Sequence, residues 1–219
     1  MQSVSVEVID ISPAAPLGFW KHWNHNTAYY GLVRRAVPSG GRDLLDVGCG
    51  HGRLARELSG PGRHVLGLDP SVEMVGAAKA DHAGVPGLEF DEGDFLAAEI
   101  PPDSFDFVCF VASLHHMDEV KALTKAAEIL RPGGRIVVIG LARARTLPEE
   151  LVSGLCKPVA WFNDLRPEFG GPEASGGAPT EEPVLGWHET RDLLLGALPG
   201  ARFRRRLYFR YSLVWTKPS

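Results

Sequence analysis

The chain has 219 residues, of which 44% are hydrophobic and 23% charged, a composition typical of a globular domain with a substantial core. Its formal net charge of −4 excludes a general electrostatic attraction to nucleic acid or to an anionic membrane. The three cysteines, Cys49, Cys109 and Cys156, are widely spaced, which excludes a disulfide framework and suits the reducing cytosol.

Residues 1–41 are expected to form a helical lead-in, and they contain no basic leader of the kind that begins a signal peptide. A helix is expected over 18–41, closed by Pro38 and two glycines. It is rich in aromatic residues. Together with two aromatic residues further along the chain, these could form a lid and an apolar pocket for the acceptor, or simply a hydrophobic core for the additional elements. The six aromatic residues are Trp20, Trp23, Tyr29, Tyr30, Trp161 and Phe162. No apolar run approaches the ~18 residues of a membrane span, so we expect a cytoplasmic protein without membrane contact.

Residues 42–142 alternate between short apolar runs and helix-like segments. The apolar runs are typical of strands buried on both faces of a sheet, and they cover 43–48, 64–69, 88–95, 104–114 and 135–141. Helices are expected at 52–60, 70–84 and 117–134, the last with Val120, Leu123, Ala127 and Leu130 on one face. This alternation predicts an α/β fold, with a mostly parallel sheet covered by helices on both faces. Right-handed crossovers then put the functional loops at the carboxyl ends of the strands.

Beyond Arg143 the alternation is lost. Residues 143–187 combine a helix-like stretch with a long Gly/Pro-rich loop, and loops of that length are uncommon unless they are functional. Residues 188–219 are expected to form a last helix and an antiparallel pair of strands at the sheet edge. The basic run at 202–206 could contact nucleic acid, but edge strands are often charged simply to discourage pairing with other chains. With no repeat in sight, we expect residues 1–219 to form a single domain.

A glycine-rich turn lies between the first expected strand and the first helix, within LLDVGCGHGRLARELS. Its glycines are Gly48, Gly50 and Gly52. The dinucleotide motif G-x-G-x-x-G would need a glycine where Arg53 stands. Asp46 comes just before the turn, and its carboxylate would repel a pyrophosphate bound there. The turn therefore favours a cofactor that is positively charged and carries no phosphate.

Carboxylates follow three successive strands of the expected sheet. Asp69 stands about 20 residues after the glycine turn, where a carboxylate can bind both hydroxyls of a ribose. Asp94 is placed to accept a hydrogen bond from an adenine amino group. Any one of these residues could instead cap the next helix. Together with Asp46, they favour S-adenosylmethionine, which has an ammonium group, a sulfonium, a ribose and an adenine.

Five segments together resemble a class I S-adenosylmethionine-dependent methyltransferase of the group that modifies small molecules. They are LLDVGCGHGRLARELS, VLGLDPSVEMVGAAK, GLEFDEGDF, SFDFVCFVASLHHM and ILRPGGRIVVI. The similarity covers Asp43 to Leu141 and becomes general beyond Arg143, where substrate choice would lie. It implies a Rossmann-like sheet of seven strands, mostly parallel with the last strand antiparallel, and an N-terminal helical lid.

The resemblance also implies a set of cofactor-binding residues. At the methionine and ribose end these are Asp46, Gly48, Cys49, Gly50 and Asp69. Around the adenine they are Pro70, Met74, Gly93, Asp94 and Phe95. Val111 would touch the methionine or methyl region. Tyr29 would reach the cofactor from the lid, with Tyr30 as the alternative, although both could simply pack.

Two adjacent histidines follow the fourth strand, in SLHHMD. His116 or His115 could be the general base that a phenol or alcohol acceptor needs, because an unperturbed histidine titrates near pH 6.5. Alternatively, the pair shapes the pocket or the start of the helix at Asp118. Adjacent loop residues rarely converge on one ion, so no metal site is expected.

These patterns predict methyl transfer by in-line displacement to a small-molecule acceptor, with S-adenosylmethionine as cofactor and a monomer or homodimer as the working form. Nucleic acid is not an expected partner, although a nucleic-acid methyltransferase is an alternative. Such enzymes often carry N-P-P-Y-like residues after the fourth strand, where this chain has VASLHH. A second alternative is a protein that binds S-adenosylmethionine without methylating, because fold does not fix function. A nicotinamide dehydrogenase is disfavoured by Arg53 and Asp46.

Overall fold

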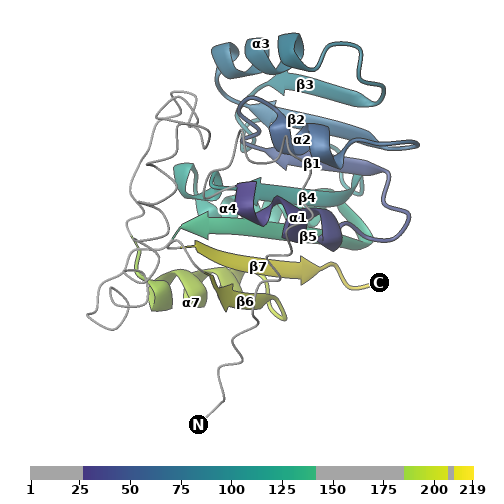
Figure 1. Cartoon of the computed structure of the whole chain (residues 1–219). Coiled ribbons are helices and arrows are strands. Elements are labelled where there is room, and N and C mark those ends of the chain that lie inside the picture. Colours follow the sequence, from purple (N-terminus) through teal and green to yellow (C-terminus); the bar gives the residue numbers. More distant parts are fainter. Residues whose placement is uncertain (1–26, 142–184, 207–209) are drawn as a thin grey trace, which may run out of the picture.

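The computed structural model of the protein describes residues 27–141, 185–206 and 210–219. In this part of the chain, seven strands form one sheet in the order β3-β2-β1-β4-β5-β7-β6 (Figure 1). The strands are β1 (Asp43–Val47), β2 (His64–Asp69), β3 (Leu88–Glu92), β4 (Phe105–Val111), β5 (Leu130–Leu141), β6 (Arg202–Arg205) and β7 (Arg210–Thr216). Strands β1 to β5 pair in parallel, whereas β7 runs antiparallel to both β5 and β6. The expected sheet, with only its last strand reversed, is confirmed.

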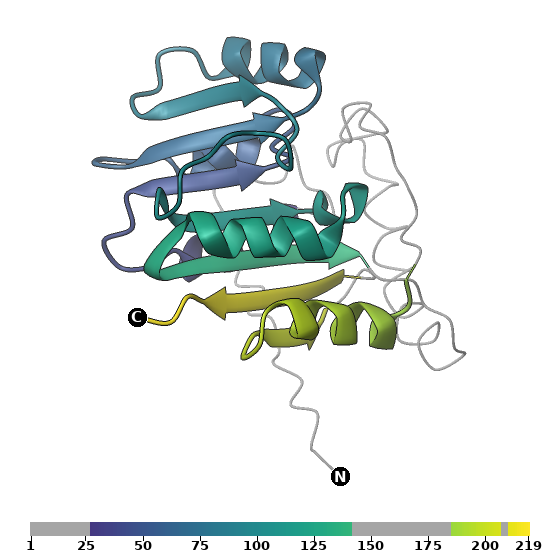
Figure 2. The same ribbon diagram turned by 180° about the vertical axis from the view of Figure 1, so that it is seen from behind.

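Helices cover both faces of this sheet, as expected (Figure 1 and Figure 2). One face carries α1 (Tyr30–Ala36), α2 (Arg53–Leu58) and α3 (Val72–Asp81), and the other carries α4 (Glu119–Ile129) and α7 (Trp187–Ala197). Two short 3-10 helices, η2 (Thr27–Tyr29) and η3 (Leu114–His116), precede α1 and α4. Successive strand side chains enter opposite cores, so Leu44 packs on the α1–α3 face and Leu45 on the α4–α7 face.

The helix expected at 117–134 is shorter than predicted, and its buried face differs. Val120 is 39% exposed, and the fully buried side chains of α4 are Ala122, Leu123, Ala126 and Ile129. Leu130 belongs to β5, where it pairs with Phe105. Proline lacks an N–H group and disfavours helical geometry in the residue before it, so Pro132 ends the helix early.

Two other helices begin at slightly different residues than expected. The helix predicted from Pro70 begins at Val72, because the hydroxyl of Ser71 accepts a hydrogen bond from the N–H of Met74 and caps the helix. The last helix begins at Trp187, one residue before its predicted start.

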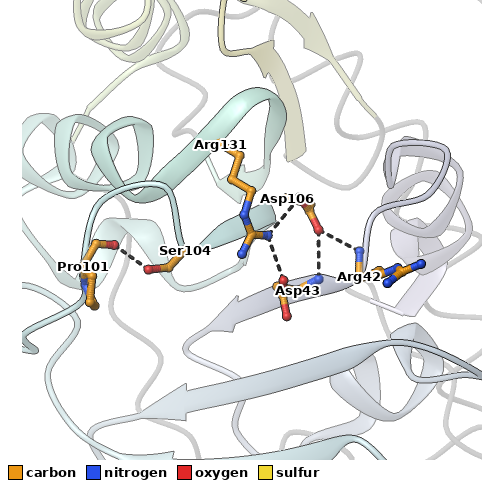
Figure 3. A network of polar contacts seen from close by, with 6 residues as sticks. All are labelled: Arg42, Asp43, Pro101, Ser104, Asp106 and Arg131. Carbon is orange, nitrogen blue, oxygen red and sulfur yellow. Dashed lines mark hydrogen bonds and ion pairs between the residues drawn. The ribbon is translucent and has the colours of Figure 1, made fainter.

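At the amino ends of β1 and β4, a polar network holds the two central strands together (Figure 3). Oδ2 of Asp106 accepts hydrogen bonds from the main-chain N–H groups of Arg42 and Asp43, at 2.7 and 3.0 Å. Nη1 of Arg131 bridges the carboxylates of Asp43 and Asp106, at 2.8 and 3.0 Å. Burial would raise the pKa of Asp106, but these donors outweigh it and hold that pKa below its usual value. The network lies at the edge opposite to the carboxyl ends, so its role is to fix the strands.

Several predictions concern parts of the chain outside the described residues. They are the aromatic residues Trp20, Trp23, Trp161 and Phe162, the helix-like stretch 148–162, the loop 166–183 and Cys156. The division into a lead-in (1–41), a cofactor-binding core (42–142), a variable region (143–187) and a final segment (188–219) within one domain stays a prediction. In the described ranges, no helix has the length and apolar character to cross a membrane.

Candidate functional site

The glycine turn is fixed to the end of β2 by main-chain hydrogen bonds. The N–H groups of Gly48 and Cys49 both donate to the oxygen of Leu68, at 2.7 and 3.2 Å. Gly48, Gly50 and Gly52 all have positive φ, of 71°, 52° and 71°, a conformation that glycine adopts without strain.

The three glycines nevertheless serve different purposes. A Cβ on Gly48 would lie 2.3 Å from Cβ of Ser113, and a Cβ on Gly52 would lie 2.3 Å from the ring of Phe90. These two positions are closed by packing within the protein. A Cβ on Gly50 would meet nothing within 4 Å, so the turn is open at this point. A ligand can therefore approach the main chain at Gly50, and the binding of the cofactor there stays a prediction.

The carboxylate of Asp69 is oriented by the turn that it faces. Its Oδ2 accepts from the N–H of Gly50 at 2.8 Å, and its Oδ1 accepts from the N–H of Ser71 at 2.9 Å. A carboxylate oxygen can accept a second hydrogen bond, so both oxygens can still accept from a ribose hydroxyl. Asp69 is half-buried at the end of β2, where such a group can reach it.

Asp46 is the most unusual residue of the site, because it is a carboxylate that is only 2% exposed. Its Oδ1 accepts a hydrogen bond from Sγ of Cys109 at 3.5 Å, whereas its Oδ2 makes no hydrogen bond within the described residues. Burial, reinforced by the charge of Asp69, raises the pKa of Asp46 to about 7. A buried carboxylate with an unsatisfied oxygen is costly unless a cation or donor joins it.

The loop after β3 lies beside Asp69. The N–H of Gly93 donates to the main-chain oxygen of Asp69 at 3.0 Å. Asp94 is exposed, and its Oδ1 accepts from the N–H of Leu96 at 2.8 Å. The ring of Phe95 points away into the core, edge-on to Phe110 with 5.6 Å between centroids. Because its ring is buried in the core, Phe95 could contact the polar edge of the adenine only through its main chain.

The remaining cofactor residues line the same edge of the sheet. Pro70 is exposed and follows Asp69 directly, and Met74 is half-buried in the first turn of α3. Val111 is half-buried at the end of β4. Cys49 is a free, half-buried thiol whose Sγ donates to the oxygen of Gly50 at 3.7 Å. Their roles toward the cofactor stay predictions.

The two tyrosines of the lead-in lie near different parts of the site. Burial, followed by the charge of Asp46, raises the pKa of Tyr30 above its usual value, so this phenol lies near the buried carboxylate. Tyr29 is 4% exposed and lies near Arg210, the first residue of β7. Burial lowers the pKa of Arg210 to about 10, and Tyr29 opposes that effect. The contact of Tyr29 with the cofactor stays a prediction. Tyr30, the alternative for this contact, lies near Asp46, which is itself a predicted cofactor-binding residue.

The histidines form η3 at the carboxyl end of β4. Their rings lie with centroids 4.0 Å apart, His115 half-buried and His116 exposed. Burial, followed by the charges of His116 and Arg210, lowers the pKa of His115 to about 4, which leaves it uncharged at neutral pH. The helix cap is Asp118 itself, whose Oδ1 accepts from the N–H of Lys121 at 3.0 Å. Among the residues that the structure describes, no group of three His, Cys, Asp or Glu side chains could hold a metal ion.

Two residues of the site were missed by the sequence analysis. Ser113 packs against Gly48 and donates from Oγ to the main-chain oxygen of Val47 at 2.5 Å. Cys109 is fully buried and donates to Asp46. The register between β1 and β4 pairs Asp46 with Cys109. Knowledge of this register would have predicted the contact between Asp46 and Cys109, but no local sequence motif indicates the register.

The residues present fit a cationic ligand that carries no phosphate. The unsatisfied Oδ2 of Asp46 calls for a cation or donor, and the space above Gly50 gives a ligand access to the turn. Asp69 adds a second negative charge close enough to Asp46 to raise its pKa. A pyrophosphate at this turn would be repelled by both carboxylates. S-adenosylmethionine has the charge and the adenosyl group that this arrangement accommodates.

Comparisons with known proteins agree with this geometry. A family model described as a methyltransferase domain matches residues 45–138. The chain is 31% identical over 203 residues to an uncharacterized methyltransferase of Mycobacterium tuberculosis, covering 90% of this chain and 98% of the relative. It is 35% identical over 107 residues to the ubiquinone biosynthesis O-methyltransferase of Aeromonas salmonicida, covering 47% of this chain and 44% of that one.

The fold is similar to that of a crystal structure of a SAM-dependent methyltransferase from Methanosarcina mazei. The TM-score is 0.58 at 19% sequence identity, covering 84% of this chain and 96% of the other. At this identity the likeness concerns the fold, and the family is shown by the relative that matches along nearly its whole length. This chain belongs to the class I S-adenosylmethionine-dependent methyltransferases.

Proposed function

We propose that this enzyme transfers the methyl group of S-adenosylmethionine to a small, partly apolar molecule bound at the carboxyl ends of β4 and β5. The observation that carries the proposal is a hollow of about 330 Å³ between η3, the first turn of α4 and α7. Small-molecule sites typically have volumes of roughly 300–1,000 Å³, with apolar walls and a few polar groups. The residues that line this hollow include His115, Met117, Glu119, Leu141, Thr190 and Leu193.

For methyl transfer, the main task of the protein is to position the methyl donor and the acceptor relative to each other. S-adenosylmethionine supplies a methyl group on a sulfonium, and a neutral thioether leaves as the acceptor forms its bond to the methyl carbon. Holding donor and acceptor in line can supply a large part of the acceleration. Asp46, Asp69 and the glycine turn would hold the donor, while Val111 and the η3 loop would face the acceptor.

His115 is the proposed general base for an acceptor that must lose a proton. It lines the hollow, and its depressed pKa keeps the imidazole uncharged near neutral pH, while it also makes the imidazole a weaker base. His116, on the exposed side of the pair, is the alternative.

The charge distribution favours a small molecule over a nucleic acid. The net charge is −4, and nucleic-acid binding is chiefly electrostatic. Within the basic segment at β6, Cζ of Arg205 lies 5.2 Å from the centroid of the Trp187 ring. Nε of Arg206 donates to Oγ of Ser212 at 2.9 Å. These contacts engage arginines of the segment within the protein and support its interpretation as a protected sheet edge.

The Aeromonas relative supports the same substrate class, because its name assigns it an O-methylation in ubiquinone biosynthesis. That similarity spans less than half of either chain. We further propose that the enzyme works in the cytoplasm as a monomer or homodimer, and the free thiols of Cys49 and Cys109 suit a reducing compartment.

The test uses S-adenosylmethionine labelled in its methyl group and a cell extract separated into small-molecule and macromolecular fractions. We expect label to be transferred to compounds in the small-molecule fraction. Asp69→Ala should abolish the transfer because it removes the carboxylate expected to bind the ribose, whereas Asp91→Ala, on the exposed part of β3, should retain it. Label in nuclease- or protease-sensitive material would contradict the proposed substrate class. Binding of S-adenosylhomocysteine without transfer to either fraction would contradict methyl transfer itself.

The base is tested on the acceptor that this assay identifies. If His115 acts as the base, the logarithm of kcat/KM for the acceptor, measured with S-adenosylmethionine saturating at every pH, rises with pH through about 4 in the wild type and is level near neutral pH. His115→Gln should remove this rise and lower kcat roughly 10²- to 10⁴-fold. A rise that survives His115→Gln and is lost in His116→Gln would assign the base to His116.

A further inference from the structure

The buried pair formed by Asp46 and Cys109 joins the two central strands of the sheet. Sγ of Cys109 on β4 donates to Oδ1 of Asp46 on β1, at 3.5 Å, and the register pairs the same two residues. Cys109 is fully buried and Asp46 is 2% exposed, so water competes little for this contact. Burial raises the pKa of Cys109 well above its usual value, so the thiol stays protonated and remains a donor throughout the physiological range.

Within the described part of the chain, no positively charged group is among those that shift the pKa of Asp46. The charge of Asp69, at the end of β2, raises the pKa of Asp46. The charge of Asp46 raises the pKa of Cys49 in the glycine turn and that of Tyr30 in α1. Among the described groups, the thiol of Cys109 and the main-chain N–H of Ala55 in α2 favour the ionised form of Asp46.

Arg53 of α2 lies close enough to Tyr30 to lower its pKa, and Glu57 opposes this effect. Within the described residues, Asp46 therefore depends on Cys109 for its one side-chain hydrogen bond. The contact holds Oδ1 in place, whereas Oδ2 is buried and makes no hydrogen bond within the described residues, so it keeps its capacity to accept one from a ligand group.

We propose that Cys109 is a positioning residue for the cofactor: its thiol orients Asp46 and sets the pH range in which that carboxylate is ionised and can bind the ammonium group of S-adenosylmethionine. The inference rests on the assignment of Asp46 to the cofactor ammonium. It makes cofactor binding a reaction that releases a proton, because the free protein holds Asp46 partly protonated and the bound cation requires it ionised.

The sign of the effect follows from the burial of Asp46. Burial raises the pKa of this carboxyl to about 7, and the hydrogen bond from Cys109 acts in the opposite direction. Affinity for a cationic ligand should therefore rise with pH and level off above about 7. Removing the thiol should raise the midpoint of this rise, because the ionised form loses its donor.

The experiment measures binding of S-adenosylhomocysteine to the full chain by calorimetry. This probe keeps its ammonium group protonated throughout the range used, from about pH 5.5 to about pH 7.5. We expect the affinity of the wild type to fall up to about tenfold for each pH unit below 7, with about one proton released per ligand near the lower limit. Parallel titrations in two buffers of different ionisation enthalpy count the protons.

Three variants assign the effect to this pair. Cys109→Ala should weaken binding about two- to tenfold near pH 6 and move the midpoint to higher pH. Cys109→Ser retains a donor and should keep the midpoint at or below that of the wild type. Asp46→Asn should bind weakly and with neither pH dependence nor proton release. The matched control is Val108→Ala, whose side chain faces the other core and which should leave the midpoint unchanged.

A second measurement needs no ligand. The infrared band of the protonated Asp46 carboxyl, identified by its loss in Asp46→Asn, should titrate near pH 7 in the wild type and at higher pH in Cys109→Ala. Equal midpoints in the wild type, Cys109→Ala and Cys109→Ser would overturn the role of Cys109. Binding that is pH-independent in the wild type would overturn the proton release. A folded wild type that binds no S-adenosylhomocysteine at any pH would overturn the assignment of Asp46 to the cofactor, whereas failure to find a small acceptor would leave all of these results standing.

Discussion

Ser113 donates a hydrogen bond from its Oγ to the main-chain oxygen of Val47, 2.5 Å away, and so ties the loop after β4 to the end of β1. Its Cβ occupies the space that a side chain on Gly48 would need. The preceding Ala112 has φ of 55°, a left-handed conformation that is strained for alanine. The loop that carries His115 and His116 is therefore held in one position against the cofactor turn.

Replacing Ser113 by alanine should loosen this connection. The change removes a buried donor, so we expect the free energy of unfolding to fall by about 1–3 kcal/mol. Affinity for S-adenosylhomocysteine should fall as well, because the turn and the η3 loop lose their shared anchor. Urea unfolding and calorimetry measure the two effects.

Ser104→Ala is the matched control for this variant. Its Oγ donates to the oxygen of Pro101 at 2.7 Å, in an exposed loop at the amino end of β4 (Figure 3). It should leave affinity for the cofactor product unchanged. Equal losses of affinity in Ser113→Ala and Ser104→Ala would show that the Ser113 contact is not specific to the site.

Gly48→Ala should be among the most damaging single substitutions in the turn. The new Cβ would lie 2.3 Å from Cβ of Ser113, and the φ of 71° would be strained for alanine. We expect a loss of about 3 kcal/mol or more in the free energy of unfolding. In Gly76→Ala, on the open side of α3, the free energy of unfolding should instead rise by up to about 1 kcal/mol. Similar midpoints for the two variants in thermal unfolding would contradict this account.

Gly50→Ala should separate binding from folding. A Cβ here meets nothing within 4 Å, so the penalty for folding is confined to a φ of 52°, about 1–2 kcal/mol. The same Cβ projects into the space expected for the cofactor, so affinity should fall at least about tenfold while the variant still folds. Circular dichroism checks the fold and calorimetry the affinity. A variant that binds as the wild type does would place the cofactor away from Gly50.

Asp46 should make the stability of the ligand-free protein depend on pH. Its pKa is raised to about 7 in the folded chain, so the folded state holds this proton more tightly than the unfolded state does. The contribution to stability is complete below the unfolded pKa of 3.8 and is lost as pH rises through about 7. Between about pH 5 and pH 8, the wild type should lose about 2–3 kcal/mol relative to Asp46→Asn. Urea unfolding of both proteins at the two pH values tests this, and parallel pH dependence would refute it.

Much of the fold follows from local features of the sequence. The apolar runs of β1, β2 and β4 and the glycines after β1 identify parallel strands and a ligand-binding turn, because a strand buried on both faces needs a continuous apolar sequence. The carboxylates at 46, 69 and 94 could be placed at one edge, because parallel strands bring their carboxyl ends together. The end of α4 could not be predicted from local features, because Leu130 belongs to β5 through its pairing with Phe105 of β4.

The amino-acid sequence by itself determined the α/β fold, the glycine turn and the charge of the cofactor that the site prefers. Only the tertiary structure decided which neighbours each residue meets: Cys109 beside Asp46, Ser113 against Gly48, and the Phe95 ring turned into the core. The physical reason is that hydrophobic periodicity and turn propensity act over a few neighbouring residues. Contacts such as that of Asp46 with Cys109 join strands 63 residues apart and depend on the register that packing selects.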